Sequence, residues 1–161
     1  MKLTLDLHVH SDASFDGRMS VRQIALLAKA RGIDGVAICD HDVVYTGPTE
    51  VEGVLIIPGA EFSTEYGHLL GLFLTAPIQH TTWKETVQAI HDQGGITVLA
   101  HPYQNKRSGS LEPFRPILDD IDAVETWNSR ANRKYPHAND NAFILALMRN
   151  KLSTGGSDAH V

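Results

Sequence analysis

The sequence predicts an α/β fold, either a parallel sheet or an α/β barrel, and three observations lead to it. Short β-rich runs alternate with stretches whose apolar residues repeat at helical spacing, as in βαβ units. Residues of metal-ligating types stand at the carboxyl ends of most of these runs, where α/β barrels build their active sites. The 161 residues show no internal repeat and no low-complexity linker. We therefore expect a single domain over residues 1–161, long enough to bury a substantial core.

The first expected strand, residues 3–10, is the stretch around which the rest of the chain is organised. Side chains alternate along a strand, so one face would carry Leu3, Leu5, Leu7 and Val9. The opposite face would carry Thr4, Asp6, His8 and His10. The apolar face would pack against helices, and the other would end in two imidazoles that can hold one metal ion.

Two further strands are expected in the first half of the chain, at residues 34–39 and 54–61. In the former, the small residues Ala37 and Cys39 lead to His41, as a crowded barrel interior would require. In the latter, Pro58 suggests an edge strand or a bulge, because proline cannot donate a hydrogen bond to a neighbouring strand.

Two helices carry clear start signals. Ser20 begins the first and Gln23 completes a capping box, with Gly32 as the stop. Thr82 begins the second, with Glu85 three residues later. The remaining expected elements are a turn at 65–67, strands at 68–74, 96–100, 122–125 and 152–155, a short helical piece near 113–120 and a helix at 139–150.

Composition and charge bound the class of protein. The net charge of −5 leaves no basic excess for a nucleic-acid surface or an anionic membrane, so neither partner is indicated. A small phosphorylated molecule remains possible, because a local positive site can hold it. The single cysteine excludes an internal disulfide and fits a reducing compartment. No apolar run reaches transmembrane length and no signal peptide precedes the first strand, so we expect a cytoplasmic protein.

Eight motifs, taken together in this order, resemble the polymerase and histidinol phosphatase (PHP) superfamily. They are Asp6-Leu7-His8-Val9-His10-Ser11, Ser14-Phe15-Asp16-Gly17, Asp40-His41-Asp42, Gly59-Ala60-Glu61, Gly67-His68-Leu69-Leu70-Gly71, Ala100-His101-Pro102, Glu125-Thr126-Trp127-Asn128 and Gly156-Ser157-Asp158-Ala159-His160. The resemblance implies a distorted (β/α)7 TIM-like barrel with up to three divalent metals. The chain stops one residue past the last motif, so we expect a barrel that is short or open at its C-terminal end.

The resemblance also implies a ligand set. His8, His10, Glu61 and Asp158 would hold a first ion. Glu61 would bridge to a second ion held with His68 and His101, and Asp16, His41 and His160 would hold a third. Imidazole and carboxylate ligands suit zinc, manganese and iron alike. We therefore expect two to three divalent ions.

These ions imply hydrolysis of a phosphoester bond in a small phosphorylated substrate. Paired divalent ions can clamp a phosphoryl group and generate hydroxide at neutral pH. The resemblance gives the catalytic roles to Glu61, His8, His10 and Asp158, and Arg130 matches a position where relatives carry a basic residue near the site.

Other polar and aromatic residues near the motifs have more ordinary interpretations. Asp40 and Asp42 are expected to orient the site or to be loop acids, and Glu125 is either an orienting residue or a strand-end acid. Cys39 is interpreted as a small buried hydrophobe, and Trp83 and Trp127 as core or rim residues.

Two other functions remain open. One is a non-catalytic metal-binding PHP module with a structural or interaction role; it is disfavoured because every expected ligand position is filled. The other is an amidohydrolase-type enzyme, which also opens with His-x-His on a barrel strand. Such enzymes commonly bridge their metals with a modified lysine, whereas the matching position here is Glu61.

Overall fold

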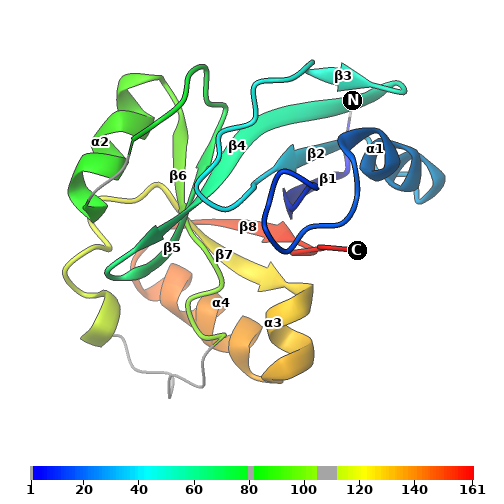
Figure 1. Cartoon of the computed structure of the whole chain (residues 1–161). Helices are drawn as coiled ribbons and strands as arrows, with labels where there is room; N and C mark the ends of the chain where they lie inside the picture. The colour runs from blue at the N-terminus through cyan, green and yellow to red at the C-terminus, as the bar shows by residue number, and fades with distance from the viewer. Residues whose placement is uncertain (1, 80–81, 105–111) are drawn as a thin grey trace.

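The computed structural model describes residues 2–79, 82–104 and 112–161. Its strands are β1 (Leu5–Val9), β2 (Gly35–Ile38), β3 (Glu50–Val51), β4 (Val54–Thr64), β5 (Gly67–Leu72), β6 (Ile96–Leu99), β7 (Ala123–Asn128) and β8 (Leu152–Gly156). They form one mixed sheet in the order β1-β2-β4-β5-β6-β7-β8, with β3 paired to β4. The sheet curls until its two end strands meet, which makes a nearly closed barrel (Figure 1).

The seam between β1 and β8 is joined at the carboxyl ends of the two strands. There the amide of Asp158 donates to the carbonyl of His8 over 2.8 Å, and the amide of His10 donates to the carbonyl of Ala159 over 2.9 Å. Val9 and Ala159 form an isolated parallel bridge at this point. In the described part of the chain the rest of this seam is unsealed. This agrees with the expected TIM-like barrel that is open beside its last strand, at the C-terminal end of the chain.

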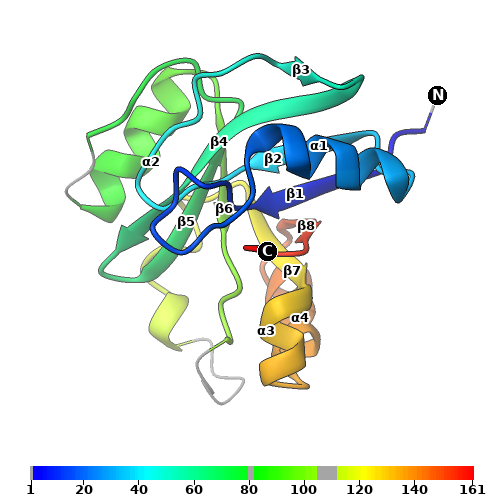
Figure 2. The same ribbon diagram turned by 45° about the vertical axis from the view of Figure 1, so that its right-hand side comes forward.

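The α-helices within the described ranges cover the outside of the barrel: α1 (Val21–Ala30), α2 (Trp83–Asp92), α3 (Ser129–Lys134) and α4 (Ala138–Met148). Helix α1 packs on β1 and β2, α2 lies over β6, and α3 and α4 lie beside β7 (Figures 1 and 2). The predicted starts of the first two helices are confirmed. Ser20 and Gln23 form the capping box of α1, and Thr82 accepts a hydrogen bond from the amide of Glu85.

The barrel interior is filled by small and branched side chains from the strands. Ala37 and Cys39 point into it, whereas Val36 and Ile38 of the same strand pack under α1. This confirms the prediction of a crowded interior next to β2. Cys39 is fully buried, as expected of a small hydrophobe, and its burial raises the pKa of the thiol.

The simple alternation expected for the first strand is wrong. Leu7 packs in the barrel interior, whereas Val9 packs under α1, so the two do not share a face. The pairing register with β2 shifts between Asp6 and Val9. His8 and His10 are nevertheless both buried with their Nε2 atoms 3.1 Å apart, so the two imidazoles meet as expected.

Two other expectations about the sheet are corrected. Pro58 lies in a strand with neighbours on both sides, at the point where the antiparallel partner of β4 changes from β3 to β5. The sheet is also not all parallel, because β5 runs antiparallel to both β4 and β6. The turn predicted at 65–67 is therefore the tip of a hairpin, and the strand after it ends at Leu72.

The short elements β3 and α3 have too few residues to show a periodic pattern, and the sequence did not predict them. In the region of the expected helical piece near 113–120 the structure has a 3-10 helix, Glu112–Phe114, followed by turns. Lys106 and Arg107, a pair of basic residues in the sequence, lie outside the described residues. Among the helices that the structure does describe, none has the length and apolar character needed to cross a membrane.

Candidate metal centre

All nine side chains expected to bind metal meet at one end of the barrel. They come from the end of β1 (His8, His10), the loop after it (Asp16), the segment after β2 (His41), β4 (Glu61), the start of β5 (His68), the end of β6 (His101) and the segment after β8 (Asp158, His160). The parallel strands bring their carboxyl ends here. Because β5 runs in the opposite direction, its first residues lie at this same end, which explains why His68 begins a strand.

The buried carboxylate of Glu61 lies at the centre of the cluster. Its Oε1 atom is 2.7 Å from His68 Nδ1 and 2.8 Å from His101 Nε2. Its Oε2 atom is 3.2 Å from His41 Nδ1 and 3.3 Å from His10 Nε2. One carboxylate therefore links histidines from four strands or strand ends, as a bridging ligand would.

Four atoms have the spacing of a metal coordination shell. His8 Nε2 and His10 Nε2 are 3.1 Å apart, and each lies 3.3–3.6 Å from Glu61 Oε2 and from Asp158 Oδ1. Ligand atoms about 2.1 Å from a central ion at tetrahedral angles are roughly 3.4 Å from one another. The first predicted ligand set thus fits a divalent ion in both donor type and spacing.

A second group of atoms surrounds Asp16. Its Oδ2 atom is 3.0 Å from His160 Nε2 and 3.6 Å from His41 Nε2, and these three residues group with His10 within 4.8 Å. The Oδ1 atom of Asp16 is buried and has no hydrogen-bond partner among the described residues. A carboxylate with one oxygen near imidazole nitrogens and the other buried without a partner fits a cation ligand.

The remaining predicted set, Glu61, His68 and His101, meets on a single oxygen of Glu61. His68 also groups with His41, and His101 also groups with His8, each within 4.8 Å. The three ligand sets are therefore parts of one continuous cluster.

Residues outside the predicted ligand set hold this cluster in place. Glu125, whose role the sequence left open, is buried and accepts hydrogen bonds from His8 Nδ1 (2.9 Å), the backbone amide of His101 (2.8 Å) and Asn128 Nδ2 (3.1 Å). The same Nδ2 atom donates to Asp158 Oδ2 over 3.2 Å. Glu125 thereby turns the Nε2 atom of His8 toward the cluster, as carboxylates do for metal-bound histidines.

The loop after β1 is fixed in a similar way. Asp40 accepts hydrogen bonds from the backbone amide and the hydroxyl of Ser11, both at 2.6 Å, which agrees with its expected orienting role. Ser14 belongs to one of the eight motifs, but no role was predicted for it. Its hydroxyl accepts a hydrogen bond from the amide of His41 over 2.9 Å and lies 3.2 Å from His10 Nδ1.

The buried histidines and carboxylates of the cluster shift one another's pKa values. Burial would lower the pKa of His8, but Glu125, Glu61 and Asp158 outweigh it and hold that pKa well above its ordinary value. Burial would raise the pKa of Glu61, but the surrounding histidines, above all His8, hold it well below. Positive charge on His8 thus offsets the buried carboxylates, and divalent cations would supply the same compensation when bound.

The backbone is strained at two of the nine candidate ligands. His101 and Asp158 are not glycines, yet they have φ angles of 24° and 56°, in the left-handed region. Such conformations concentrate at functional sites, where the surrounding structure holds them. In Asp158 the conformation coincides with the hydrogen bond that joins β8 to β1.

A cavity of about 310 Å³ opens over the cluster. Its lining contains seven of the nine candidate ligands, together with Phe15, Ser63, Gln104, Arg130, Ala131 and Lys134. The structure thus places Arg130 in the cavity: its Nη1 atom is 2.8 Å from His160 Nε2 and 3.9 Å from Asp158 Oδ1. Lys134, which lies one turn further along α3, was not predicted, because α3 itself was missed.

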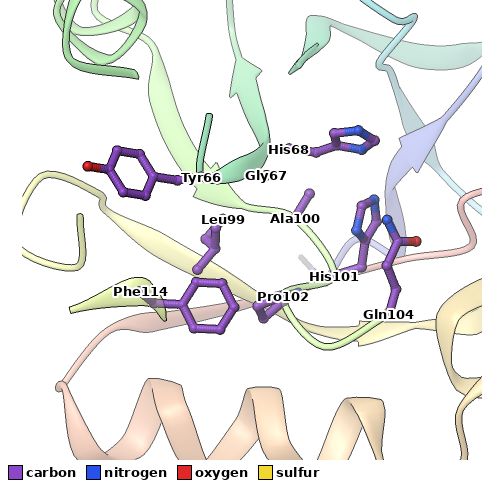
Figure 3. Close-up of a pocket in the computed structure, with 9 residues that line it drawn as sticks. All are labelled: Tyr66, Gly67, His68, Leu99, Ala100, His101, Pro102, Gln104 and Phe114. Carbon is purple, nitrogen blue, oxygen red and sulfur yellow. The ribbon is translucent and has the colours of Figure 1, made fainter. Parts of the chain in front are cut away.

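A smaller recess of about 70 Å³ adjoins the cavity (Figure 3). His68, His101 and Gln104 line both spaces. Tyr66, Leu99 and Phe114 form the side of the recess that lies away from the two histidines. The two tryptophans lie outside these spaces: Trp83 is buried in the core and Trp127 is exposed, as expected.

The fold and the cluster define a metal-site barrel of a known kind. The family model described as the PHP domain matches residues 6–107, and the chain belongs to this family. Two uncharacterised proteins of Methanocaldococcus jannaschii are 34% and 33% identical over 143 and 166 residues; the alignments cover 77% and 98% of this chain and 81% and 65% of theirs. A protein of Acetivibrio thermocellus named a probable phosphatase is 26% identical over 167 residues, which cover 89% of this chain and 68% of that protein.

Solved structures share the fold at low sequence identity. A two-domain protein from Bacteroides vulgatus, described as containing a predicted PHP-like metal-dependent phosphoesterase, superposes with a TM-score of 0.78 at 20% identity, covering 98% of this chain and 52% of that one. A protein from Bifidobacterium adolescentis, described as a putative metal-dependent phosphoesterase, gives 0.75 at 19% identity, covering 100% and 89%. This chain thus spans about half the length of the first of these structures.

Proposed function

We propose that this chain is a metal-dependent phosphoesterase that hydrolyses a phosphoester bond in a small phosphorylated substrate. The observation that carries the proposal is the position of Glu61, whose two oxygens lie within 3.3 Å of four histidines at the floor of an open cavity. The names of a relative and of two structural neighbours, a phosphatase and two phosphoesterases, support the same class of reaction.

Zinc, manganese or iron would suit the nitrogen and oxygen ligands of this cluster. His8, His10, Glu61 and Asp158 would hold one ion, Glu61, His68 and His101 a second, and Asp16, His41 and His160 a third. Such ions, when bound, would lower the pKa of water and offset negative charge on a phosphoryl group.

The chain's own residues would bind and orient the substrate. Arg130 projects from α3 into the cavity, where its guanidinium can donate hydrogen bonds to phosphoryl oxygens. Glu125 and Asn128 hold His8 and Asp158 in place from behind the cluster. Glu61 would bridge two of the ions. Amidohydrolases commonly use a lysine at a strand end for this role, whereas the cavity-lining Lys134 lies on helix α3.

The test combines metal analysis with kinetics. Protein purified without chelator should contain at least two divalent ions per chain and should hydrolyse at least one member of a panel of phosphomonoesters and phosphodiesters. The Glu61→Ala variant should lose most of its bound metal and all measurable turnover, because it removes a ligand from two ions. The matched control is Glu50→Ala, which removes an exposed carboxylate in β3 and should behave as wild type.

Metal content well below one ion per chain after incubation with manganese or zinc would overturn the proposal. Full metal content without hydrolysis of any phosphoester would instead support the non-catalytic metal-binding module. Near-normal turnover in Glu61→Ala would show that no bridged pair of ions carries the reaction.

A further inference from the structure

Phe15 lies at the rim of the cavity with its ring in solvent. Its side chain is among those lining the cavity, yet the residue is 87% exposed, more than any other large hydrophobic residue that the structure describes. An exposed phenylalanine on a surface is ordinary by itself. At the mouth of a candidate active site, however, it presents an aromatic surface to whatever enters.

The loop around Phe15 is fixed on both sides of that residue. Ser14 contacts His10 and His41, and Asp16 contacts His160. Gly17 packs so closely on Ser11 that a Cβ atom added to Gly17 would lie 1.9 Å from the carbonyl oxygen of Ser11. The backbone at Phe15 is therefore held by contacts on both sides, which limits the conformational entropy that this loop would lose when a ligand binds.

The orientation of the ring leaves one face open. Phe15 stacks on the imidazole of His41, with centroids 5.0 Å apart and planes inclined by 27°. His41 lies beside one side of the phenyl ring, and the 87% exposure of the residue leaves most of the ring surface, including the other face, to solvent. A flat ligand can stack on that face, as bases do on exposed aromatic side chains.

Positive charge lies in the same cavity. Arg130 and Lys134 both project from α3 and line the cavity together with Phe15. A ligand that places a phosphoryl group near the cluster and Arg130 can therefore extend a flat ring toward Phe15. The cavity volume of about 310 Å³ is within the range of sites for small organic ligands.

We propose that Phe15 is a specificity-determining residue, and that the preferred substrates are phosphomonoesters whose organic part carries a flat aromatic ring. This inference rests on the proposed function and names the substrate class of the same site. The shared chemistry is the aromatic ring, whether it is a nucleobase or a phenyl group.

Two pairs of substrates test the inference, because the members of each pair release similar alcohols and differ in the aromatic ring. The first pair is adenosine 5′-monophosphate and ribose 5-phosphate, and the second is benzyl phosphate and cyclohexylmethyl phosphate. For each pair, kcat/KM is measured with the metal-loaded wild type, Phe15→Ala and Phe15→Trp. Bound metal is quantified in all three proteins, since Phe15 touches His41.

The wild type should favour the aromatic member of at least one pair by roughly tenfold, the size expected of one stacked ring. Phe15→Ala should reduce that ratio to about one at normal metal content, and Phe15→Trp should retain it. The matched control is Phe143→Ala, which removes another half-exposed phenyl ring, on α4 and outside the cavity, and should keep the wild-type ratio. A preference in the first pair alone identifies a nucleobase, and one in the second alone identifies a phenyl group.

Equal kcat/KM for both members of both pairs in the wild type would overturn the inference and leave the proposed function standing. So would a ratio that Phe15→Ala does not change. Failure of the metal-loaded wild type to hydrolyse any of the four compounds, or any member of the wider phosphoester panel, would overturn the proposed function and this inference with it.

Discussion

Glu125 shows how strongly a candidate metal ligand depends on a residue behind it. Its carboxylate accepts hydrogen bonds from His8 Nδ1, from the amide of His101 and from Asn128 Nδ2. Three donors converge on a group that has only acceptors, so each donor is satisfied. When a metal ion binds and displaces the Nε2 proton, His8 would keep its proton on Nδ1, with the lone pair of Nε2 directed toward the space shared with His10, Glu61 and Asp158.

This arrangement predicts a specific defect in Glu125→Gln. The amide oxygen of glutamine can serve the two donors at the Oε2 position, but its NH2 group then faces His8 Nδ1. His8 would accept that hydrogen bond and carry its proton on Nε2, where a metal should bind. We expect affinity for the first metal ion to fall about ten- to a hundredfold.

The measurement is a competition titration of metal-free protein with zinc or manganese against a chromophoric chelator. Glu52→Gln is the matched control, because its carboxylate pairs with Arg22 on the surface and should leave the affinity unchanged. Wild-type affinity in Glu125→Gln would show that the contact with His8 does not select the tautomer.

At the scale of elements, the seam between β1 and β8 depends on the absence of one side chain. A Cβ atom on Gly156 would lie 2.4 Å from His8 Cβ and 2.8 Å from His8 N. Gly156→Ala should therefore push the two strands apart, with a loss of about 1–3 kcal/mol in the free energy of unfolding. Gly155→Ala is a close control, since its nearest contact would be an ordinary 3.4 Å to Trp127. Urea unfolding of both variants measures the difference, and equal stabilities would contradict the tight fit at the seam.

A polar network at the opposite end of the barrel joins α2, β6 and the start of β7. Asp122 Oδ2 accepts hydrogen bonds from the amide of Thr97 (2.9 Å), the hydroxyl of Thr97 (2.8 Å) and His91 Nε2 (2.9 Å). Burial alone would raise the pKa of Asp122, but these hydrogen bonds outweigh it and hold the pKa below its ordinary value. The ionised form is thus favoured by folding.

The lowered pKa of Asp122 makes its contribution to stability depend on pH. A carboxylate with a lowered pKa in the folded state stabilises the protein above its unfolded pKa of about 3.9, and this stabilisation is lost as the pH falls through the folded value. The difference in unfolding free energy between wild type and Asp122→Asn should therefore shrink as the pH falls from about 5 to below about 4. Urea unfolding at several pH values measures it. A difference that grew with acidification would contradict this assignment.

The sequence predicted most elements of the fold because their signals are local. The capping residues Ser20 and Thr82 and the alternation in β2 depend on neighbours within a few positions. The antiparallel direction of β5 and the bulge in β1 depend on strand pairing across the sheet, which no local pattern encodes. For the candidate site, the residue types at strand ends pointed to the right end of the barrel. The contacts of Ser14, Glu125 and Phe15 required the three-dimensional arrangement.

At the scale of the whole molecule, the cluster lies across the junction that closes the barrel. His8 and His10 come from the first strand, and Asp158 and His160 from the last residues of the chain. The backbone joins the two sides through the hydrogen bonds from Asp158 to His8 and from His10 to Ala159. An ion held by residues from both sides would fasten the same junction.

Metal removal should therefore loosen this junction more than the rest of the barrel. A ligand that binds only the folded state adds about 2.7 kcal/mol to stability when its free concentration is a hundred times its Kd, so chelation should lower the melting temperature.

Locally, hydrogen exchange should accelerate most at the amides of His10 and Asp158, which donate across the seam. The amides of the β4–β5 hairpin beyond the site, such as that of Leu72, provide the internal control. Hydrogen exchange followed by mass spectrometry, with and without chelator, makes the comparison. A uniform acceleration over the whole sheet would contradict the proposed local fastening, and unchanged exchange at the seam would show that no ion links β1 to β8.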